Sequence, residues 1–270
     1  QSAGGGSVKT ICESPLARGL FHKAIIQSAG GITVPSQGAG MGAPRGFNFP
    51  GMGAPAEKKL AAYKAPVAPE GLNALQRSEF NTKVVMDWAG YNTLAKMRAA
   101  DTEVMHTVAT IYNNATGNFG SVSGGPIVDG YVSLESFDAA ALDGTLADVP
   151  YMIGYTLNDM GNMSDGIAAF CKNRQEKGNK AYAYEFARPL PDDGSHPEVT
   201  ARLKGAFHSS ELWFMFHSLK NSWRPFTEAD YALSDKMMDF WTNFCKYADP
   251  QGGWKPYTAE DPYMQILDIE

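Results

Sequence analysis

The chain opens with Gln1-Ser2-Ala3-Gly4-Gly5, a stretch that matches the second half of a GxSxG turn. In that turn a serine lies on a strained corner between a strand and a helix, and small neighbours let the backbone bend while the hydroxyl stays exposed. Ser2 supplies the serine and Gly4 the trailing glycine, whereas the leading glycine and its strand would precede residue 1. The stretch predicts that Ser2 is a nucleophile at the start of a helix.

An identical copy of these five residues, Gln27-Ser28-Ala29-Gly30-Gly31, follows the short apolar strand predicted at 24–26. Ile26 occupies the position where the turn requires glycine. The segment 32–35 that follows ends in proline and cannot start a helix at Ser28. We therefore favour Ser2 as the nucleophile and keep Ser28 as the alternative.

Composition limits the partners that the chain can have. Of its 270 residues 44% are hydrophobic, which is enough for a large core, and the formal net charge is -6. Lys and Arg do not cluster, so nucleic acid and anionic membrane surfaces are not expected as partners. No apolar run approaches the roughly 20 residues that span a bilayer, so no membrane span is expected. The three widely spaced cysteines predict small buried side chains rather than a zinc site or disulfides: Cys12, Cys171 and Cys245.

Helical and strand patterns alternate along the chain. Helices are predicted at 3–14, 16–23, 57–64, 77–88, 93–109, 162–177 and 227–247. Strands are predicted at 24–26, 126–132, 149–156, 181–187 and 264–269, with a turn at Asp129-Gly130 in the second of them. Residues 30–56, rich in Gly, Pro and Met, predict an irregular surface excursion that lines a pocket or covers a core. This alternation indicates an α/β architecture with a mostly parallel sheet.

Two loops carry further candidate groups, because reactive residues in such sheets collect beyond the carboxyl ends of strands. Asp159 follows the buried strand 149–156, where its carboxylate could accept a hydrogen bond from an imidazole. A place in a turn or at the N-cap of the helix at 162–177 is an equally natural use of this aspartate. His208 lies among small and hydroxyl residues in the loop 205–211, as a general base would. The remaining histidines have structural explanations: His22 and His106 in helical patterns, His196 in a loop and His217 after an aromatic run.

Together, Ser2, Asp159 and His208 follow the chain order Ser, acid, His that α/β-hydrolases use. In this arrangement His208 would take the proton of Ser2, and Asp159 would stabilise the imidazolium. The Ala3 N–H would donate to the oxyanion of the intermediate.

These segments resemble the type B carboxylesterases of the cholinesterase and para-nitrobenzyl esterase group. Residues 1–8 resemble the nucleophile segment of that family, and 153–161 its acid loop, where Asp159 takes the place of the commoner Glu. The loop 205–211 is similar to its histidine loop, and 240–250 to a C-terminal helix motif. Gln1 stands where the family usually has Glu. The resemblance implies supporting positions beside the reacting groups for three residues, Gln1, Ser28 and Glu211.

The resemblance also implies how the chain is organised. Residues 1–270 would form the C-terminal part of a single α/β-hydrolase catalytic domain, with an irregular loop insertion at about 30–56. The first strands and the oxyanion glycines would belong to an N-terminal half, which would be a partner of this chain. No metal or organic cofactor is expected. Composition gives no location, while the resemblance favours a secreted or periplasmic protein over a cytoplasmic one.

The function expected from these features is hydrolysis of a small-molecule carboxylic ester through an acyl-enzyme. An aryl or short-chain ester is favoured, and feruloyl or acetylated-polysaccharide esters stay open. Apolar walls are suggested by the excursion 30–56 and the aromatic run 213–216. The alternatives are a non-catalytic cholinesterase-like binding domain and an inert fragment of an esterase.

Overall fold

The structure is a computed structural model that describes residues 1–33, 67–105, 108 and 126–269. Contacts divide the chain into two compact units, one of residues 1–36 and 134–270 and one of residues 37–133. The excursion predicted at 30–56 and the helix predicted at 57–64 lie outside the described residues, apart from positions 30–33. The assignment of 1–270 to a single domain stays a prediction.

A parallel sheet of four strands lies at the centre of the larger unit. Its order follows the chain: β1 (Ala24–Gln27), β2 (Tyr151–Thr156), β3 (Ala181–Phe186) and β4 (Met264–Leu267). Every residue of β2 is buried, as expected for an apolar strand between two others in a sheet covered on both faces. These strands confirm four of the five that the sequence predicted.

One face of the sheet is covered by α1 (Ala3–Glu13), α6 (Phe137–Asp143) and α7 (Ser164–Glu176). Phe170 of α7 stacks on Phe137 and meets the edge of Tyr151, so a single aromatic ring joins two helices to the sheet. The small residues of β3, Ala181 and Ala183, face this layer.

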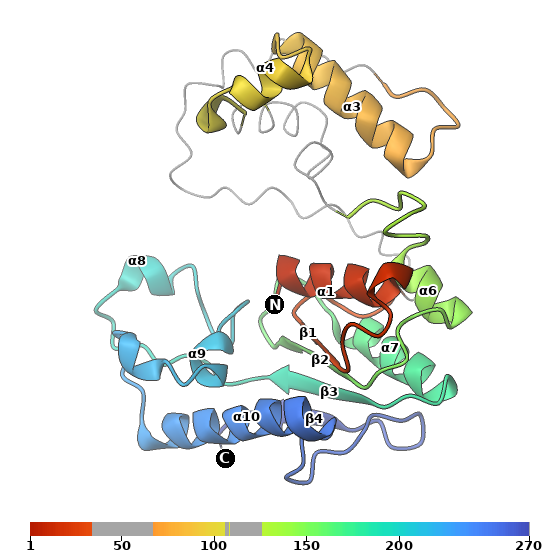
Figure 1. Cartoon of the computed structure of the whole chain (residues 1–270). Coiled ribbons are helices and arrows are strands. Elements are labelled where there is room, and N and C mark those ends of the chain that lie inside the picture. Colours follow the sequence, from red (N-terminus) through yellow and green to blue (C-terminus); the bar gives the residue numbers. More distant parts are fainter. Residues whose placement is uncertain (34–66, 106–107, 109–125, 270) are drawn as a thin grey trace. The chain divides into compact units, whose positions relative to one another are not determined.

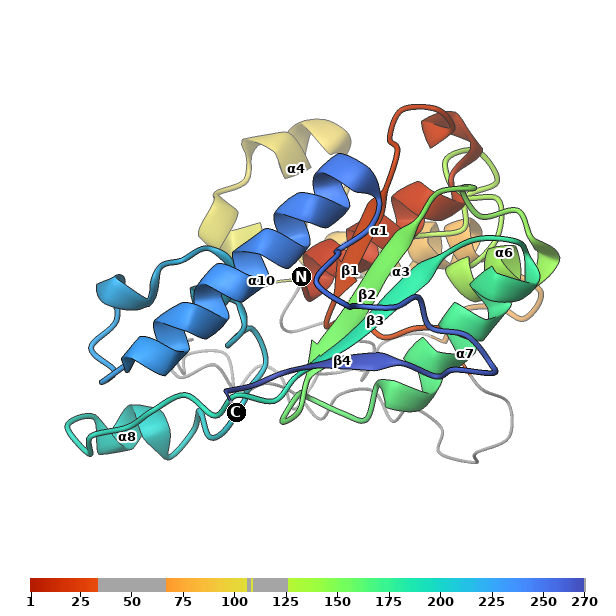
Figure 2. The ribbon, with the colours of Figure 1, turned by 90° about the horizontal axis from the view of Figure 1, so that it is seen from below.

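The opposite face carries α10 (Glu228–Tyr247) and the short α9 (Leu212–Met215). Tyr182, Tyr184 and Phe186 of β3 point to this side and pack against the apolar stripe of α10, as the alternation in 181–187 predicted. Thr227 and Asp230 form a capping box at the start of α10. Figure 1 and Figure 2 show α10 and α7 on opposite sides of the strands, which confirms the α/β layered architecture.

The remaining elements of the larger unit are short: η1 (Pro15–Ala17), α8 (Pro197–Thr200) and η2 (Leu219–Asn221). No helix in the described ranges has the length and apolarity needed to cross a bilayer.

The second unit contains α3 (Ala74–Trp88) and α4 (Leu94–Ala99). Asn73 and Gln76 form a capping box that starts α3 three residues before the predicted helix at 77–88. The predicted helix 93–109 is interrupted, because Ala100 is extended and Asp101 accepts a hydrogen bond from the Glu103 N–H of a new helical turn.

Two further predictions were wrong. Residues 16–23 do not form a helix, because η1 ends at Ala17 and Gly19 has a positive φ of 77°. No strand forms at 126–132, although the turn predicted at Asp129-Gly130 is present: the Asp129 carboxylate accepts from three successive backbone N–H groups, and Gly130 has a φ of 77°. The cysteine prediction holds for Cys12 and Cys171, whereas Cys245 is exposed on α10.

Candidate active site

Ser2 lies on a strained corner directly before α1. Its φ of 55° and ψ of -126° are unfavourable for a residue other than glycine, and such strain persists only where the surroundings enforce it. The Ser2 N–H donates to the Gln27 carbonyl at 2.8 Å, which ties the corner to the end of β1. Helix α1 follows at once, as the sequence predicted for a nucleophile turn.

Gly5 allows this corner to lie close to the sheet. A Cβ at Gly5 would lie 2.7 Å from the Ala29 Cβ and 2.9 Å from the Gln27 carbonyl oxygen. At Gly4 and Gly6 no atom of the described residues lies within 4 Å of the same position. Close packing therefore explains why glycine is required at position 5, whereas no steric contact explains glycine at positions 4 and 6.

Asp159 lies three residues beyond the end of β2, and its side chain is fully buried. Its Oδ2 accepts from the Thr156 hydroxyl at 3.1 Å, and its Oδ1 accepts from the Met160 N–H at 2.8 Å. It does not cap α7, because Asn162 accepts from the Ser164 N–H that begins that helix. Asp159 is therefore not a helix cap, although its carboxylate does accept hydrogen bonds within its own turn.

His208 is brought to Asp159 by contacts that sequence reasoning missed. The Asn158 N–H donates to the Ala206 carbonyl at 2.9 Å, and the Ala206 N–H donates to Asn158 Oδ1 at 3.0 Å. Gly205 is needed there, since a Cβ would lie 2.1 Å from Asn158 Oδ1. No local pattern indicates this clamp, because its two sides are 48 positions apart.

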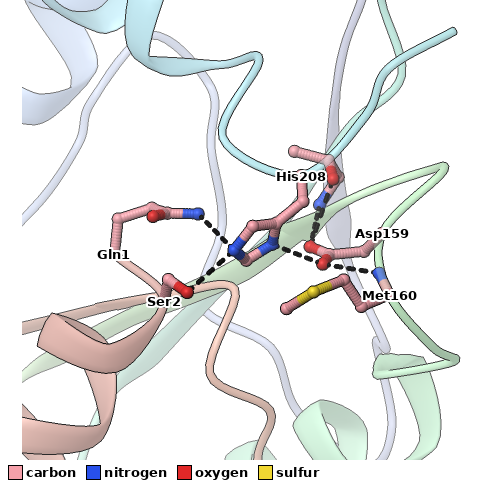
Figure 3. A network of polar contacts seen from close by, with 6 residues as sticks. Gln1, Ser2, Asp159, Met160 and His208 are labelled. Carbon is pink, nitrogen blue, oxygen red and sulfur yellow. Dashed lines mark hydrogen bonds and ion pairs between the residues drawn. The ribbon is translucent and has the colours of Figure 1, made fainter. Parts of the chain in front are cut away.

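Ser2, His208 and Asp159 form one continuous chain of hydrogen bonds (Figure 3). His208 Nδ1 lies 2.6 Å from Asp159 Oδ1, and His208 Nε2 lies 2.8 Å from Ser2 Oγ. Because an ionised carboxylate can only accept, Nδ1 carries the proton and donates to Asp159. Nε2 is then free to accept from the Ser2 hydroxyl, which is the geometry of a base beside a nucleophile.

The pKa values of Asp159 and His208 agree with an ionised Asp159 that accepts from His208 Nδ1–H. Burial opposes ionisation of Asp159, but the hydrogen bond with His208, the neighbouring Ser28 hydroxyl and the Met160 N–H outweigh it and lower its pKa to about 2. The hydrogen bond and negative charge of Asp159 raise the pKa of His208 above its ordinary value, although partial burial opposes the change.

Gln1 and Ala3 flank the serine. The Gln1 Nε2 lies 3.3 Å from His208 Nε2, so its amide donates toward the same lone pair that the Ser2 hydroxyl uses (Figure 3). Ala3 is the first residue of α1, and its N–H belongs to the free amino end of the helix, where backbone donors favour negative charge.

Ser28 and Glu211 also lie in this region. Ser28 follows β1 with a φ of 48°, and it does not begin a helix, in agreement with the preference for Ser2 as nucleophile. Its hydroxyl is buried near Asp159 and lowers the pKa of that carboxyl. The Ser28 hydroxyl nevertheless makes no hydrogen bond of ordinary geometry with another described residue. Glu211 is fully buried three residues after His208, and burial raises its pKa to about 7.

The other described histidines lie apart from this chain of hydrogen bonds. His22 is exposed in a bend rather than a helix, and His196 precedes α8. The His217 Nδ1 lies 3.2 Å from Ser234 Oγ at the buried face of α10. His106 lies outside the described residues. In the described ranges no three His, Cys, Asp or Glu side chains are grouped so as to hold a metal ion.

Comparison with known proteins finds sequences similar to this chain among esterases and lipases. The profile described as "Carboxylesterase family" matches residues 162–270. The medium-chain fatty acyl-CoA hydrolase precursor of Anas platyrhynchos is 23% identical over 324 residues, covering 98% of this chain and 53% of that protein. The human bile salt-activated lipase is 33% identical over 101 residues, covering 33% of this chain and 12% of that protein.

Solved structures show the same fold. A PNB esterase superposes with a TM-score of 0.66 at 17% identity, covering 99% of this chain and 57% of that one. Nearly all of this chain aligns with the acyl-CoA hydrolase precursor and the PNB esterase, but the chain spans only about half of their length. The solved structures and the parallel sheet between two helical layers show that the chain has the α/β-hydrolase fold, and the match of residues 162–270 to the carboxylesterase profile supports the type B carboxylesterase family.

Proposed function

We propose that the protein hydrolyses carboxylic esters through an acyl-enzyme, with Ser2 as nucleophile, His208 as general base and Asp159 as its acidic partner. The observation that carries the proposal is the chain of hydrogen bonds from Ser2 Oγ through both imidazole nitrogens to a buried carboxylate. The match of residues 162–270 to the carboxylesterase profile and the names of the relatives, a hydrolase, a lipase and an esterase, support this class of reaction.

In the first half of the reaction, His208 Nε2 takes the Ser2 proton as Oγ attacks the ester carbonyl carbon. The carbonyl π electrons move to the oxygen, and the Ala3 N–H donates to the resulting oxyanion. Asp159 holds the Nδ1–H and stabilises the imidazolium through the 2.6 Å contact. The intermediate collapses, the bond to the alcohol breaks, and His208 returns the proton to the departing oxygen.

In the second half, a water molecule attacks the acyl-enzyme and gives one proton to His208 Nε2. Collapse of the second intermediate breaks the bond to Ser2 Oγ, which regains the proton from His208. The products are one carboxylic acid and one alcohol, and the enzyme returns to its starting state.

We propose an aryl or short-chain acyl ester as substrate. Of the run 213–216, Phe216 is 68% exposed and is available to contact an apolar group, whereas Phe214 is fully buried in the core and cannot line a wall. The other apolar segment considered, 30–56, lies outside the described residues except for positions 30–33.

The assay uses the full-length protein and p-nitrophenyl acetate and butyrate. Ser2→Ala is expected to lower kcat by roughly a thousandfold or more, because no other nucleophile occupies the corner. Ser7→Ala, an exposed serine of α1, is the matched control and should keep the rate of the parent. Unchanged hydrolysis by Ser2→Ala would refute the proposal. A parent without activity on any ester would favour the binding-domain alternative.

A further inference from the structure

One arginine is buried beside the loop that carries His208. Arg224 lies in the connection between η2 and α10 and is 8% exposed. Its Nη1 donates to the Pro191 carbonyl at 2.8 Å, in the segment that follows β3. Burial lowers the pKa of Arg224, and the charge of Asp192 offsets part of this change. Among the described residues its guanidinium forms no ion pair, so this buried cation needs partners of another kind.

Two aromatic rings supply these partners. The Arg224 Cζ lies over the Trp223 ring, 4.7 Å from its centroid, and over the Phe207 ring, 5.9 Å from its centroid. A planar guanidinium stacks on aromatic faces and is attracted by them within about 6 Å. The Trp223 ring is itself packed against His196, with 4.3 Å between the two centroids. Arg224 therefore joins a packed aromatic pair to the residue that directly precedes His208.

The backbone on the other side of His208 is strained. Ser209 has a φ of 74°, which is unfavourable for a residue other than glycine, and such strain persists only where the surroundings enforce it. The Ser210 N–H donates to the Phe207 carbonyl at 2.9 Å and closes a turn around the histidine. Phe207 is thus the first residue of the turn that holds His208 in place.

The position of this turn decides the geometry of the candidate site. The clamp at Ala206 fixes the loop before the turn, whereas Arg224 contacts the ring of its first residue. His208 has to lie 2.6 Å from Asp159 and 2.8 Å from Ser2 at the same time. A movement of the turn lengthens at least one of these contacts, and a displacement near 1 Å can lower a rate by roughly a hundredfold.

We propose that Arg224 is a positioning residue for His208 and that it acts through the ring of Phe207. The expected effect on ester hydrolysis rests on the proposed function, whereas the expected effect on the contact between His208 and Asp159 does not. Arg224 holds the turn by stacking and by its hydrogen bond to Pro191, so its planar fork matters as well as its charge.

The kinetic test compares Arg224→Met with the full-length parent on p-nitrophenyl acetate. The kcat of the variant should fall by roughly 10- to 100-fold at nearly constant KM, because the base is displaced. The matched control is Lys236→Met on α10, which removes a cation 5.8 Å from the centroid of Phe240 and should keep the parental kcat. Parental kcat for a folded Arg224→Met, or an equal loss in Lys236→Met, would overturn the positioning role.

A double-mutant cycle with Phe207→Leu tests the path through the ring. In the Phe207→Leu background, Arg224→Met should lower kcat by no more than about threefold, since the contact is already lost. An undiminished loss in that background would overturn the path through Phe207. If Arg224→Met does not fold, Arg224→Lys replaces it, because lysine keeps the charge without the planar fork. Parental kcat for Arg224→Lys would then overturn the proposal.

The pKa of His208, followed by NMR titration of its ring protons in the full-length protein, gives a test that does not need ester hydrolysis. The hydrogen bond with Asp159 raises this pKa, so a looser contact lowers it, whereas loss of a positive charge alone would raise it. Arg224→Met should therefore titrate at lower pH than the parent, and an unchanged or higher midpoint would overturn the proposal. A purely structural role would change the free energy of unfolding and leave this midpoint in place. The proposed function fails separately, through Ser2→Ala.

Discussion

Replacing Gly5 by alanine tests how tightly the nucleophile corner is held against the sheet. The new Cβ would lie 2.7 Å from the Ala29 Cβ and 2.9 Å from the Gln27 carbonyl oxygen, distances that real Cβ atoms do not show. The obstacles are a backbone atom and a side chain with no freedom to rotate away. Either α1 or the end of β1 must therefore move.

The cost follows from two terms. Forcing an extra methyl group into a packed site costs about 1–3 kcal/mol, while replacing glycine by alanine in a helix gains about 1 kcal/mol. Gly6→Ala in the same helix gains the second term alone, since no described atom lies within 4 Å of its new Cβ. The difference between the two variants isolates the strain, and Gly5→Ala should be about 1–3 kcal/mol less stable than Gly6→Ala.

The assay is urea unfolding of both variants, together with p-nitrophenyl acetate hydrolysis. Because Gln27 also accepts the Ser2 N–H, a shift at this contact displaces Ser2 from His208. A displacement near 1 Å can lower the rate by roughly a hundredfold, so Gly5→Ala should lose activity that Gly6→Ala keeps. Equal free energies of unfolding and equal rates for the two variants would refute the close-packing argument.

Three further predictions concern the acid and its loop. Asp159→Asn should lower kcat by several orders of magnitude at nearly constant KM, because the amide no longer stabilises the imidazolium; a loss below tenfold in steady-state kinetics would contradict the assignment. The kcat/KM of the parent should rise with pH through a midpoint above 6.5, since His208 acts as a neutral base and its pKa is raised above that value. Asp159→Asn should move this midpoint to lower pH, because the carboxylate that raises the pKa of His208 is gone. An unchanged midpoint in the variant would count against the pairing of Asp159 with His208. Asn158→Ala should lower kcat by roughly one to two orders of magnitude, whereas Asn158→Asp keeps the acceptor for the Ala206 N–H and most of the rate; equal kinetics for both variants would exclude the clamp.

Long elements with strong local signals were predictable. The stripe and capping box of α10, the apolar run of β2 and the aromatic alternation of β3 each lie within one segment of chain, so the sequence contains the whole signal. The errors fell where a single residue decided the outcome. Gly19 ended a helical pattern, and the Asp129 side chain turned an apolar run into a turn by accepting three backbone N–H groups.

The sequence by itself determined the α/β class, the helix after Ser2 and the candidates Ser2, Asp159 and His208, because motif, chain order and periodicity are properties of short segments. Only the tertiary structure decided that the three side chains lie within hydrogen-bonding distance of one another. It also decided that Asn158 joins their loops, that Gly5 lies against Gln27, and that Glu211 is buried with no hydrogen-bonding partner among the described residues. Each of these depends on atoms that are far apart along the chain and that only the folded sheet brings together.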